Sequence, residues 1–399
     1  MPAALALKPS RFGPRSAPKE GTESPAPRPA VRASRLYALD GMRLFAALSV
    51  LSFHWTAYVG ISGIWQGVTP REVIPLVNRA AAYGWMGVEL FFVISGFVIC
   101  MSCWGKRPGE FFSSRVVRLY PAYWAGVVLT SSVILLLPHL ARRRAGSGLT
   151  LRTVLGNLTM LQSPLGLRPV DGVYWTLWVE MRFYLLFAVV VAMGLTYRKV
   201  VAFCGIWTIV AVVAGQVDNQ LLDTVAMPQE SPLFIAGMAM FLMYRFGQDL
   251  LLWGIVGFSW LLALVRIPAI RAVYVEALGH PLSWSVTAVL MTAAFALVLA
   301  AALGALDWVR WRWLTVAGAL TYPLYLIHQE IGWTIIHWSL KHGLGVRSAL
   351  LVALVTVLTT AWLIHRFVER PLAGRLKKGL QHSMTRLRAA SDTPAAPQG

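Results

Sequence analysis

Long apolar stretches recur along most of this 399-residue chain, and they limit its possible folds more than any other feature. Each stretch runs for about the 17 to 25 residues that an α-helix, rising about 1.5 Å per residue, needs to cross the hydrocarbon core of a bilayer. Strands of a membrane barrel would be about half as long and would alternate in polarity. The pattern therefore predicts an all-α, polytopic transmembrane helical bundle.

We expect about ten membrane-spanning helices. The expected spans lie at about 38–59, 84–104, 119–138, 172–195, 199–216, 231–246, 250–267, 282–305, 314–339 and 346–367. With the N-terminus inside, the cytoplasmic segments hold 23 of the 36 Lys and Arg residues, and the external segments hold 11. Because cytoplasmic loops carry an excess of basic residues, both termini are predicted to be cytoplasmic.

The composition agrees with a membrane environment. Hydrophobic residues make up 57% of the chain and charged residues only 13%, whereas soluble domains carry roughly 25% charged residues. The net charge of +19 would suggest nucleic acid in a soluble protein, but the basic residues fall mainly in tails and loops. Topology and attraction to anionic headgroups explain them. We expect a multi-pass membrane protein, with membrane lipids and no nucleic acid as partners.

The chain divides into three parts. Residues 1–35 are rich in Pro, Ala, Ser and Arg and have no apolar core, which predicts a disordered cytoplasmic tail. Residues 36–371 form the transmembrane domain, and residues 372–399 are expected to be a disordered, basic cytoplasmic tail. The run Arg142-Arg143-Arg144 is an exception to the charge bias, because this topology places it outside.

Cys100 and Cys103 form a CxxC pair at the end of an apolar span. This spacing can mark redox or zinc chemistry, but no second cysteine pair or nearby histidine cluster completes a site. We therefore interpret the pair as structural and expect no metal.

Arg43 and His54 are ionisable residues in the first expected span. Such residues cost about 2.5 to 3.5 kcal/mol each inside a membrane, so they are functional candidates. They are eleven residues apart, which at about 100° per residue places both on one helical face, separated by about 16 Å. Arg43 suits a phosphate-bearing donor, and His54 could remove a hydroxyl proton or carry the acyl group. The alternatives are an arginine that reaches the headgroups and a histidine that links helices.

Carboxylates and a hydroxyl lie in two further spans. Glu89 could pair with Arg43 or orient His54, whereas Ser95 could act in the site or only permit close helix packing. In the fourth span, Glu180 is a candidate partner for His54. The predicted catalytic residues are therefore His54, Arg43, Glu180 and Glu89.

Arg115 and Arg118 precede Pro121 and Trp124 at the start of the third span. Their i, i+3 spacing puts both guanidinium groups on one helical face, where they could clamp the phosphates of an acyl-coenzyme A together with Arg43. The alternative is a pair of ordinary topogenic arginines beside an aromatic belt.

The ninth span contains a second deep histidine, His328, shortly after Tyr325. These residues, with Ser95, could line an acceptor site, or His328 could tie helices together.

Taken together, these motifs resemble acyltransferase family 3, which includes O-antigen acetylases, Nod-factor acetyltransferases and macrolide acyltransferases. The resemblance runs from about Tyr37 to Pro371. Its motifs are Leu39-Asp40-Gly41 leading to Arg43 and His54, the segment GVELFFVISGF, the Arg115/Arg118 pair, WTLWVE ending in Glu180, YPLYLIH ending in His328, and Glu369-Arg370-Pro371.

The resemblance implies about ten helices, a cytoplasmic acyl-coenzyme A donor as co-substrate and no tightly bound cofactor. By resemblance, Arg43 and His54 match the catalytic pair of the family, and Arg115 and Arg118 match its donor-linked arginines. Met181 and Arg182 depart from the common form of the fourth-span motif. Many bacterial members also carry a C-terminal esterase-like domain, and the last 30 residues here predict no such domain.

The predicted function is transfer of an acyl group, in the first place acetyl, to a hydroxyl of a carbohydrate-like acceptor. That acceptor could be a cell-surface glycan, a lipid-linked sugar or a glycosylated metabolite. The alternative is a transporter or a flippase of lipid-linked glycans, which would also place buried charges around a cavity. Consumption of acetyl-coenzyme A by the purified protein distinguishes the two classes.

Overall fold

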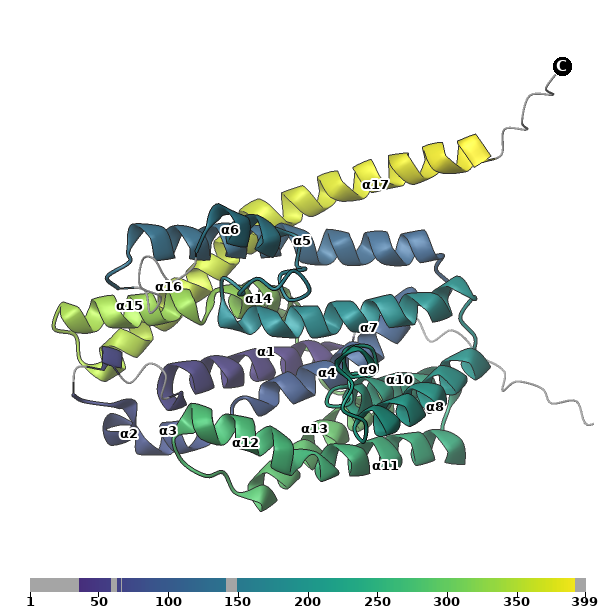
Figure 1. Cartoon of the computed structure of the whole chain (residues 1–399), viewed down its shortest axis with the longest axis horizontal. Helices are drawn as coiled ribbons and strands as arrows, with labels where there is room; N and C mark the ends of the chain where they lie inside the picture. The colour runs from purple at the N-terminus through teal and green to yellow at the C-terminus, as the bar shows by residue number, and fades with distance from the viewer. Residues whose placement is uncertain (1–35, 59–62, 66, 141–148, 392–399) are drawn as a thin grey trace, which may run out of the picture.

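The computed structural model describes residues 36–58, 63–65, 67–140 and 149–391, and all regular structure in these ranges is helical. The expected tail at residues 1–35 and the run Arg142-Arg143-Arg144 lie outside the described residues. The axes of most of the long helices are roughly aligned, so that the helices form a bundle (Figure 1). The chain is thus an all-helical polytopic bundle, as predicted.

Ten helices of 16 residues or more lie in the described part of the chain, and shorter segments connect them. The long helices are α1 (Tyr37–Ser52), α4 (Met86–Cys103), α5 (Pro108–Leu136), α7 (Trp175–Ala192), α8 (Tyr197–Ala214), α10 (Ser231–Phe246), α11 (Leu250–Val265), α13 (Trp284–Ala302), α16 (Val346–Leu363) and α17 (Arg370–Ser391). The intermediate helices are α12 (Ile267–Leu278), α14 (Trp313–Ile327) and α15 (Glu330–Lys341). The shorter segments are the π-helices η1 (Phe53–Ala57) and η4 (Ile364–Glu369), the 3-10 turn η3 (Gly172–Tyr174), and α2 (Pro70–Val73), α3 (Pro75–Ala81), α6 (Leu151–Leu158) and α9 (Gln220–Ala226).

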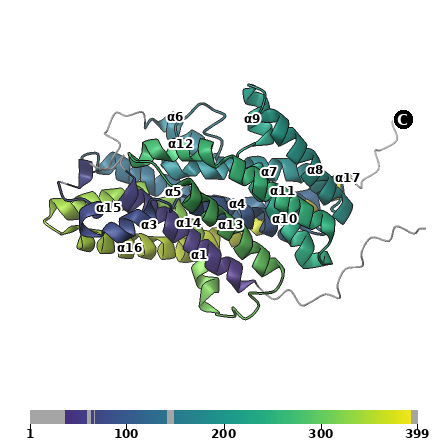
Figure 2. The ribbon, with the colours of Figure 1, turned by 90° about the horizontal axis from the view of Figure 1, so that it is seen from below.

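Within the described residues, seven helices are long and apolar enough to cross a membrane, and the bent pair α11 and α12 makes an eighth. The expected count of ten was higher because two expected spans are broken. The first changes from α1 into the π-helix η1, and the ninth stops after Ile327 and restarts at Glu330. Figure 2 also shows α9 projecting from the bundle beside α8.

Helix α4 is the central element, and it packs against α1, α10 and α13. Gly96 of α4 and Gly237 of α10 face each other so closely that a Cβ on either residue would collide with the backbone of the other helix. Gly87 allows the same close approach to Ala46 of α1. Small residues let helix backbones approach in membranes, so these glycines fix the position of α4 and of Glu89 on it.

Helix α17 differs from the expected disordered tail. It continues the chain from η4 and packs along α5, and its end reaches away from the bundle on the right of Figure 1. Its half-buried apolar residues recur every four positions, which forms one apolar stripe; they are Leu372, Leu376, Leu380 and Met384. The many basic residues of this segment obscure a regular helical pattern that was present in the sequence.

Candidate functional site

Two cavities lie on either side of α4. The larger one, the His54 cavity, has a volume of about 630 Å³, and its polar lining comes from His54, Glu89, Gln229, Glu230 and Gln329. The smaller one, the Arg43 cavity, has a volume of about 100 Å³. Its polar lining comes from Arg43, Ser95, Arg118, Thr176, Glu180, Thr321, Tyr322 and Tyr325.

One thin wall separates the cavities. Val88 and Phe92 of α4 and Tyr325 of α14 line both of them. The Tyr325 hydroxyl is held by Thr176 Oγ1 at 2.8 Å and donates to the Val173 carbonyl at 3.3 Å. The two cavities are therefore adjacent and are separated by these three side chains.

His54 and His328 meet at the edge of the larger cavity. His54 lies in the π-helix η1, and His328 lies at the break between α14 and α15. His54 Nδ1 is 3.0 Å from His328 Nε2, although 274 residues separate them in the sequence. His328 is buried, with 1% of its surface exposed. Two local distortions of the helices thus bring the two predicted histidines together.

The hydrogen bonds determine which nitrogen of His54 can act as a base. His328 Nδ1 lies 2.7 Å from the Tyr325 carbonyl oxygen. A carbonyl only accepts, so this nitrogen carries the proton, and in a neutral ring His328 Nε2 is then an acceptor. His54 Nδ1 must therefore donate to it. This arrangement leaves Nε2 of a neutral His54 with the lone pair.

Two tryptophans fix the backbone around the histidine pair. Trp55 Nε1 donates to the His328 carbonyl at 2.7 Å, and Trp333 Nε1 donates to the His54 carbonyl at 2.9 Å. Irregular helical turns leave carbonyls without their usual partners, and the two indoles satisfy these groups reciprocally. Tyr58 also stacks on Trp333, with ring planes 6° apart. The histidines are held by rigid aromatic neighbours.

The smaller cavity gathers three of the predicted charged residues. Arg43 forms an ion pair with Asp40, with Nη1 and Oδ1 3.7 Å apart. Glu180 accepts hydrogen bonds from Ser95 Oγ at 3.2 Å and from the hydroxyl of Tyr184. One predicted pairing is therefore corrected. Glu180 contacts Ser95 and Tyr184 instead of His54, whose histidine partner is His328.

Glu89 lies in the other cavity and does not take the pairings proposed for it. It lines the His54 cavity and is buried, but it makes no hydrogen bond or ion pair with Arg43 or His54. Its carboxylate instead faces the space beside His54, where it can accept a hydrogen bond from a bound hydroxyl.

The two arginines of α5 have different environments. Arg118 is exposed and lines the Arg43 cavity, whereas Arg115 is buried. The Arg115 guanidinium lies 5.9 Å from the ring centres of both Phe111 and Tyr184 and donates to Ser102 Oγ at 3.0 Å. The structure therefore separates the pair into one cavity residue and one packing residue.

This separation predicts different effects of the two alanine variants. Arg118→Ala should raise the donor KM about tenfold, because loss of one charge-assisted contact costs about 1.5 kcal/mol. Arg115→Ala should leave the donor KM within about threefold and lower Tm, because it removes packing from two aromatic rings. Kinetics and thermal unfolding of both variants in lipid nanodiscs measure this. Equal increases in KM with unchanged Tm would restore the two-arginine clamp predicted from the sequence.

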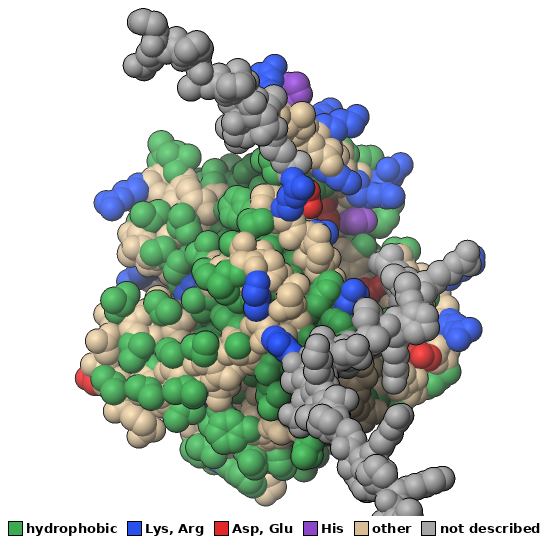
Figure 3. Space-filling model, turned by 90° about the vertical axis from the view of Figure 1, so that its right-hand side faces the viewer, with side chains coloured by type: hydrophobic (Ala, Val, Ile, Leu, Met, Phe, Trp, Pro, Cys, Tyr) green, Lys and Arg blue, Asp and Glu red, His purple; other side chains and the backbone are tan. Residues whose placement is uncertain are grey.

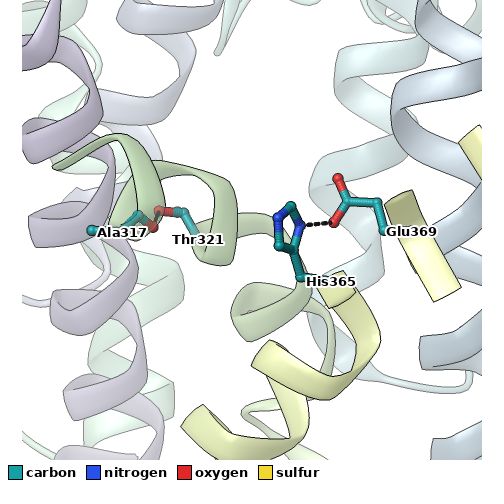
Figure 4. A network of polar contacts seen from close by, with 4 residues as sticks. All are labelled: Ala317, Thr321, His365 and Glu369. Carbon is teal, nitrogen blue, oxygen red and sulfur yellow. Dashed lines mark hydrogen bonds and ion pairs between the residues drawn. The ribbon is translucent and has the colours of Figure 1, made fainter. Parts of the chain in front are cut away.

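The last of the family motifs, Glu369-Arg370-Pro371, begins at the end of η4, which packs against α14. Glu369 Oε2 is 2.8 Å from His365 Nδ1, one helical turn away on η4. Figure 4 shows this pair on one side and Thr321 of α14, which lines the Arg43 cavity, on the other. Because η4 contacts both α5 and α14, the pair stabilises the junction of the two helices that carry Arg118 and Tyr325.

Sequence reasoning missed four residues of the site. Asp40 lies in the motif Leu39-Asp40-Gly41, and Tyr184 follows the WTLWVE motif. Their sequence separations from Arg43 and Glu180, i, i+3 and i, i+4, were usable signals. Trp55 and Trp333 gave a weaker signal, since they are two of 17 tryptophans in the chain. Their partners are distant in sequence, so only the fold reveals them.

Comparisons with known proteins agree with the motifs. A family model described as an acyltransferase domain matches residues 36–366. Exopolysaccharide production protein ExoZ of Rhizobium meliloti (strain 1021) is 34% identical over 166 residues, which cover 39% of this chain and 49% of ExoZ. Acyltransferase MdmB of Streptomyces mycarofaciens is 27% identical over 161 residues, 39% of each chain. Protein 2 in the picA locus of Rhizobium radiobacter is 30% identical over 110 residues, 26% of this chain and 48% of that protein.

The matched regions span less than half the length of each of these relatives. No solved structure matches the chain. The family match, in contrast, covers most of the chain and includes both histidines and all the charged residues of the two cavities. The chain therefore belongs to acyltransferase family 3.

Proposed function

We propose that this protein is an integral membrane O-acyltransferase that moves an acetyl group from acetyl-coenzyme A to a hydroxyl of a carbohydrate-like acceptor. The observation that carries the proposal is the pair of cavities that share Val88, Phe92 and Tyr325, with arginines in one and the histidine pair beside the other. A donor and an acceptor bound on either side of this wall would meet near His54.

The Arg43 cavity suits the donor. Guanidinium groups bind phosphates in planar, multi-donor contacts, and Arg43 and Arg118 both line this cavity. Its volume of about 100 Å³ holds only part of coenzyme A, so we place the phosphates at the arginines and the thioester toward the wall of Val88, Phe92 and Tyr325. Basic side chains lie over the face shown in Figure 3, which is the end of the bundle where α17 terminates. We assign this face to the cytoplasm, which holds acetyl-coenzyme A.

The His54 cavity suits a sugar-like acceptor. It is about six times larger in volume and presents the aromatic side chains of Trp85, Trp175 and Tyr274. Sugar rings stack on aromatic faces, and Glu89 and Gln329 add hydrogen-bonding groups near His54. A few polar groups in a largely apolar cavity are typical of small-molecule sites.

The proposed reaction uses the lone pair on His54 Nε2. His54 removes the proton of the acceptor hydroxyl as the oxygen attacks the thioester carbonyl carbon. The carbon–sulfur bond then breaks, and the coenzyme A thiolate takes the proton from the imidazolium. His328 Nε2 accepts the hydrogen bond from His54 Nδ1 throughout and stabilises the positive charge. If His54 carries the acyl group instead, the same nitrogen makes the attack.

The relatives support this class of reaction over transport. MdmB is named as an acyltransferase, and ExoZ is named for exopolysaccharide production. An acyl donor and a carbohydrate acceptor would account for both names. We place the protein in the bacterial inner membrane, with both termini in the cytoplasm.

The function can be tested with purified protein in nanodiscs. We expect coenzyme A to be released from acetyl-coenzyme A only when cell-envelope glycans are supplied, with one acetyl group gained by the glycan for each coenzyme A released. A free-thiol assay and mass spectrometry measure the two quantities. Movement of a glycan across proteoliposomes without thiol release would instead establish the transporter alternative.

A further inference from the structure

A third cavity is lined by basic side chains and lies beyond the His54 cavity. Its volume is about 340 Å³, and its lining comes from Arg71, Pro75, Asn78, Arg79 and His280. Arg71 lies on α2, Arg79 lies on α3, and His280 follows the end of α12. These elements lie together on the left of Figure 1, at the opposite end of the bundle from the terminus of α17.

The two arginines of this cavity have no partner within the described residues. The ion pairs found there involve Arg43 and His365, and neither Arg71 nor Arg79 makes a hydrogen bond through its guanidinium group. Glu72, the neighbouring carboxylate, accepts hydrogen bonds from the backbone N–H and the hydroxyl of Thr69. Both side chains are exposed to solvent and line one cavity, an arrangement that suits an anion.

Both arginines lie on one short segment of the chain. Residues 60–83 contain two basic residues, and both line the cavity. The proposed topology places this segment outside.

Helices α3 and α12 connect the lining of this cavity with the surroundings of His54. Asn78, in its lining, donates from Nδ2 to the backbone carbonyl of Thr56, two residues after His54. Helix α12 lines the His54 cavity with Tyr274 and Ala277, and His280 lies just beyond the end of this helix. Arg71 and Arg79 therefore lie on elements that pack beside the segment of His54, although the two cavities share no lining residue.

On the basis of the proposed function, we propose that the acceptor is anionic and that Arg71 and Arg79 bind its phosphate group while its hydroxyl reaches His54. A phosphate offers the oxygen geometry that a pair of guanidinium groups binds best. The same chemistry occurs in the headgroup of an acidic lipid, so the test must separate these two sources.

Direct binding of glucose 1-phosphate and of glucose tests the site without any reaction. In neutral phosphatidylcholine nanodiscs, glucose 1-phosphate should bind the wild-type protein, and Arg71→Gln with Arg79→Gln should weaken it about tenfold or more. Arg71→Lys with Arg79→Lys should retain part of the affinity. The affinity for glucose should be the same for the wild-type protein and for both double variants. Arg347→Gln is the matched control, because Arg347 lies near α2 and donates to the Val73 carbonyl, outside the cavity lining.

A second set of nanodiscs, with phosphatidylglycerol, separates acceptor from lipid. The proposal expects the affinity for glucose 1-phosphate to stay within about threefold. Loss of binding in these nanodiscs would assign the cavity to lipid headgroups and overturn the proposal. Equal affinity of the wild type and the double glutamine variant would overturn it as well. No acyl donor is present in this binding experiment. A negative result would therefore concern the anion site alone, whereas the acyltransferase function is tested separately by the release of coenzyme A.

Discussion

Replacing His54 by alanine should abolish nearly all acyl transfer while the protein still inserts and folds. Loss of a general base lowers kcat by about 10²-fold or more. The same substitution removes one hydrogen bond to His328 Nε2, which is worth on the order of 1 kcal/mol in a membrane protein. The donor KM should change little, since Arg43 and Arg118 lie in the other cavity.

His337 provides the matched control for His54. It lies on α15, and its Nδ1 contacts the Leu140 carbonyl at 2.9 Å, but it lines neither cavity. His337→Ala should therefore keep kcat within about twofold. Rates of acetyl transfer and Tm in nanodiscs measure both variants. A fully active His54→Ala variant would remove His54 from the chemistry, and an unfolded one would show that its role is structural.

The spans that could be predicted from the sequence are the uninterrupted apolar ones. The expected span at 84–104 corresponds to α4, and the expected span at 282–305 corresponds to α13. In these segments the apolar run and the helix end together, because polar and glycine-containing sequences follow. Hydropathy is sufficient wherever the helix is continuous.

The breaks in the helices could not be predicted in the same way. In the expected span at 314–339, α14 ends just before the polar run His328-Gln329-Glu330, but polar residues inside a span do not by themselves show that the helix stops there. The change from α1 to the π-helix η1 is similarly invisible. Both irregularities are stabilised by the indoles of Trp55 and Trp333, which are contacts between distant parts of the chain. These breaks are what form the candidate site.

The sequence identified residues that line the two cavities, but it did not identify the contacts between them. Helical periodicity places a side chain on a face but does not identify the helix that it meets. For this reason Glu180 was matched with His54, whereas its contacts are Ser95 and Tyr184. The charge pattern likewise predicts one role for Arg115 and Arg118. Sequence spacing does not reveal that the Arg115 guanidinium lies against the rings of Phe111 and Tyr184.

Replacing His328 should have the second largest effect on catalysis, although we place this residue behind His54 and not in contact with the acceptor. His328→Ala should lower kcat by about 10²-fold, the scale of effect expected when a reacting group is misplaced by about 1 Å. His54 would lose the acceptor for its Nδ1 proton, and its ring could rotate or change tautomer. The acceptor and donor KM values should stay within about threefold.

A glutamine at this position separates a positioning role from packing. The side-chain oxygen of the glutamine in His328→Gln can lie near the position of Nε2 and accept a hydrogen bond from His54 Nδ1. The kcat of this variant should therefore be about tenfold higher than that of His328→Ala. His328→Leu fills a similar volume without an acceptor and should resemble the alanine variant. Rates for the three variants at several pH values, with Tm as the control for folding, complete the test. If leucine restored the rate as well as glutamine does, His328 would only pack against its neighbours, and the tautomer of His54 would have to be set by another group.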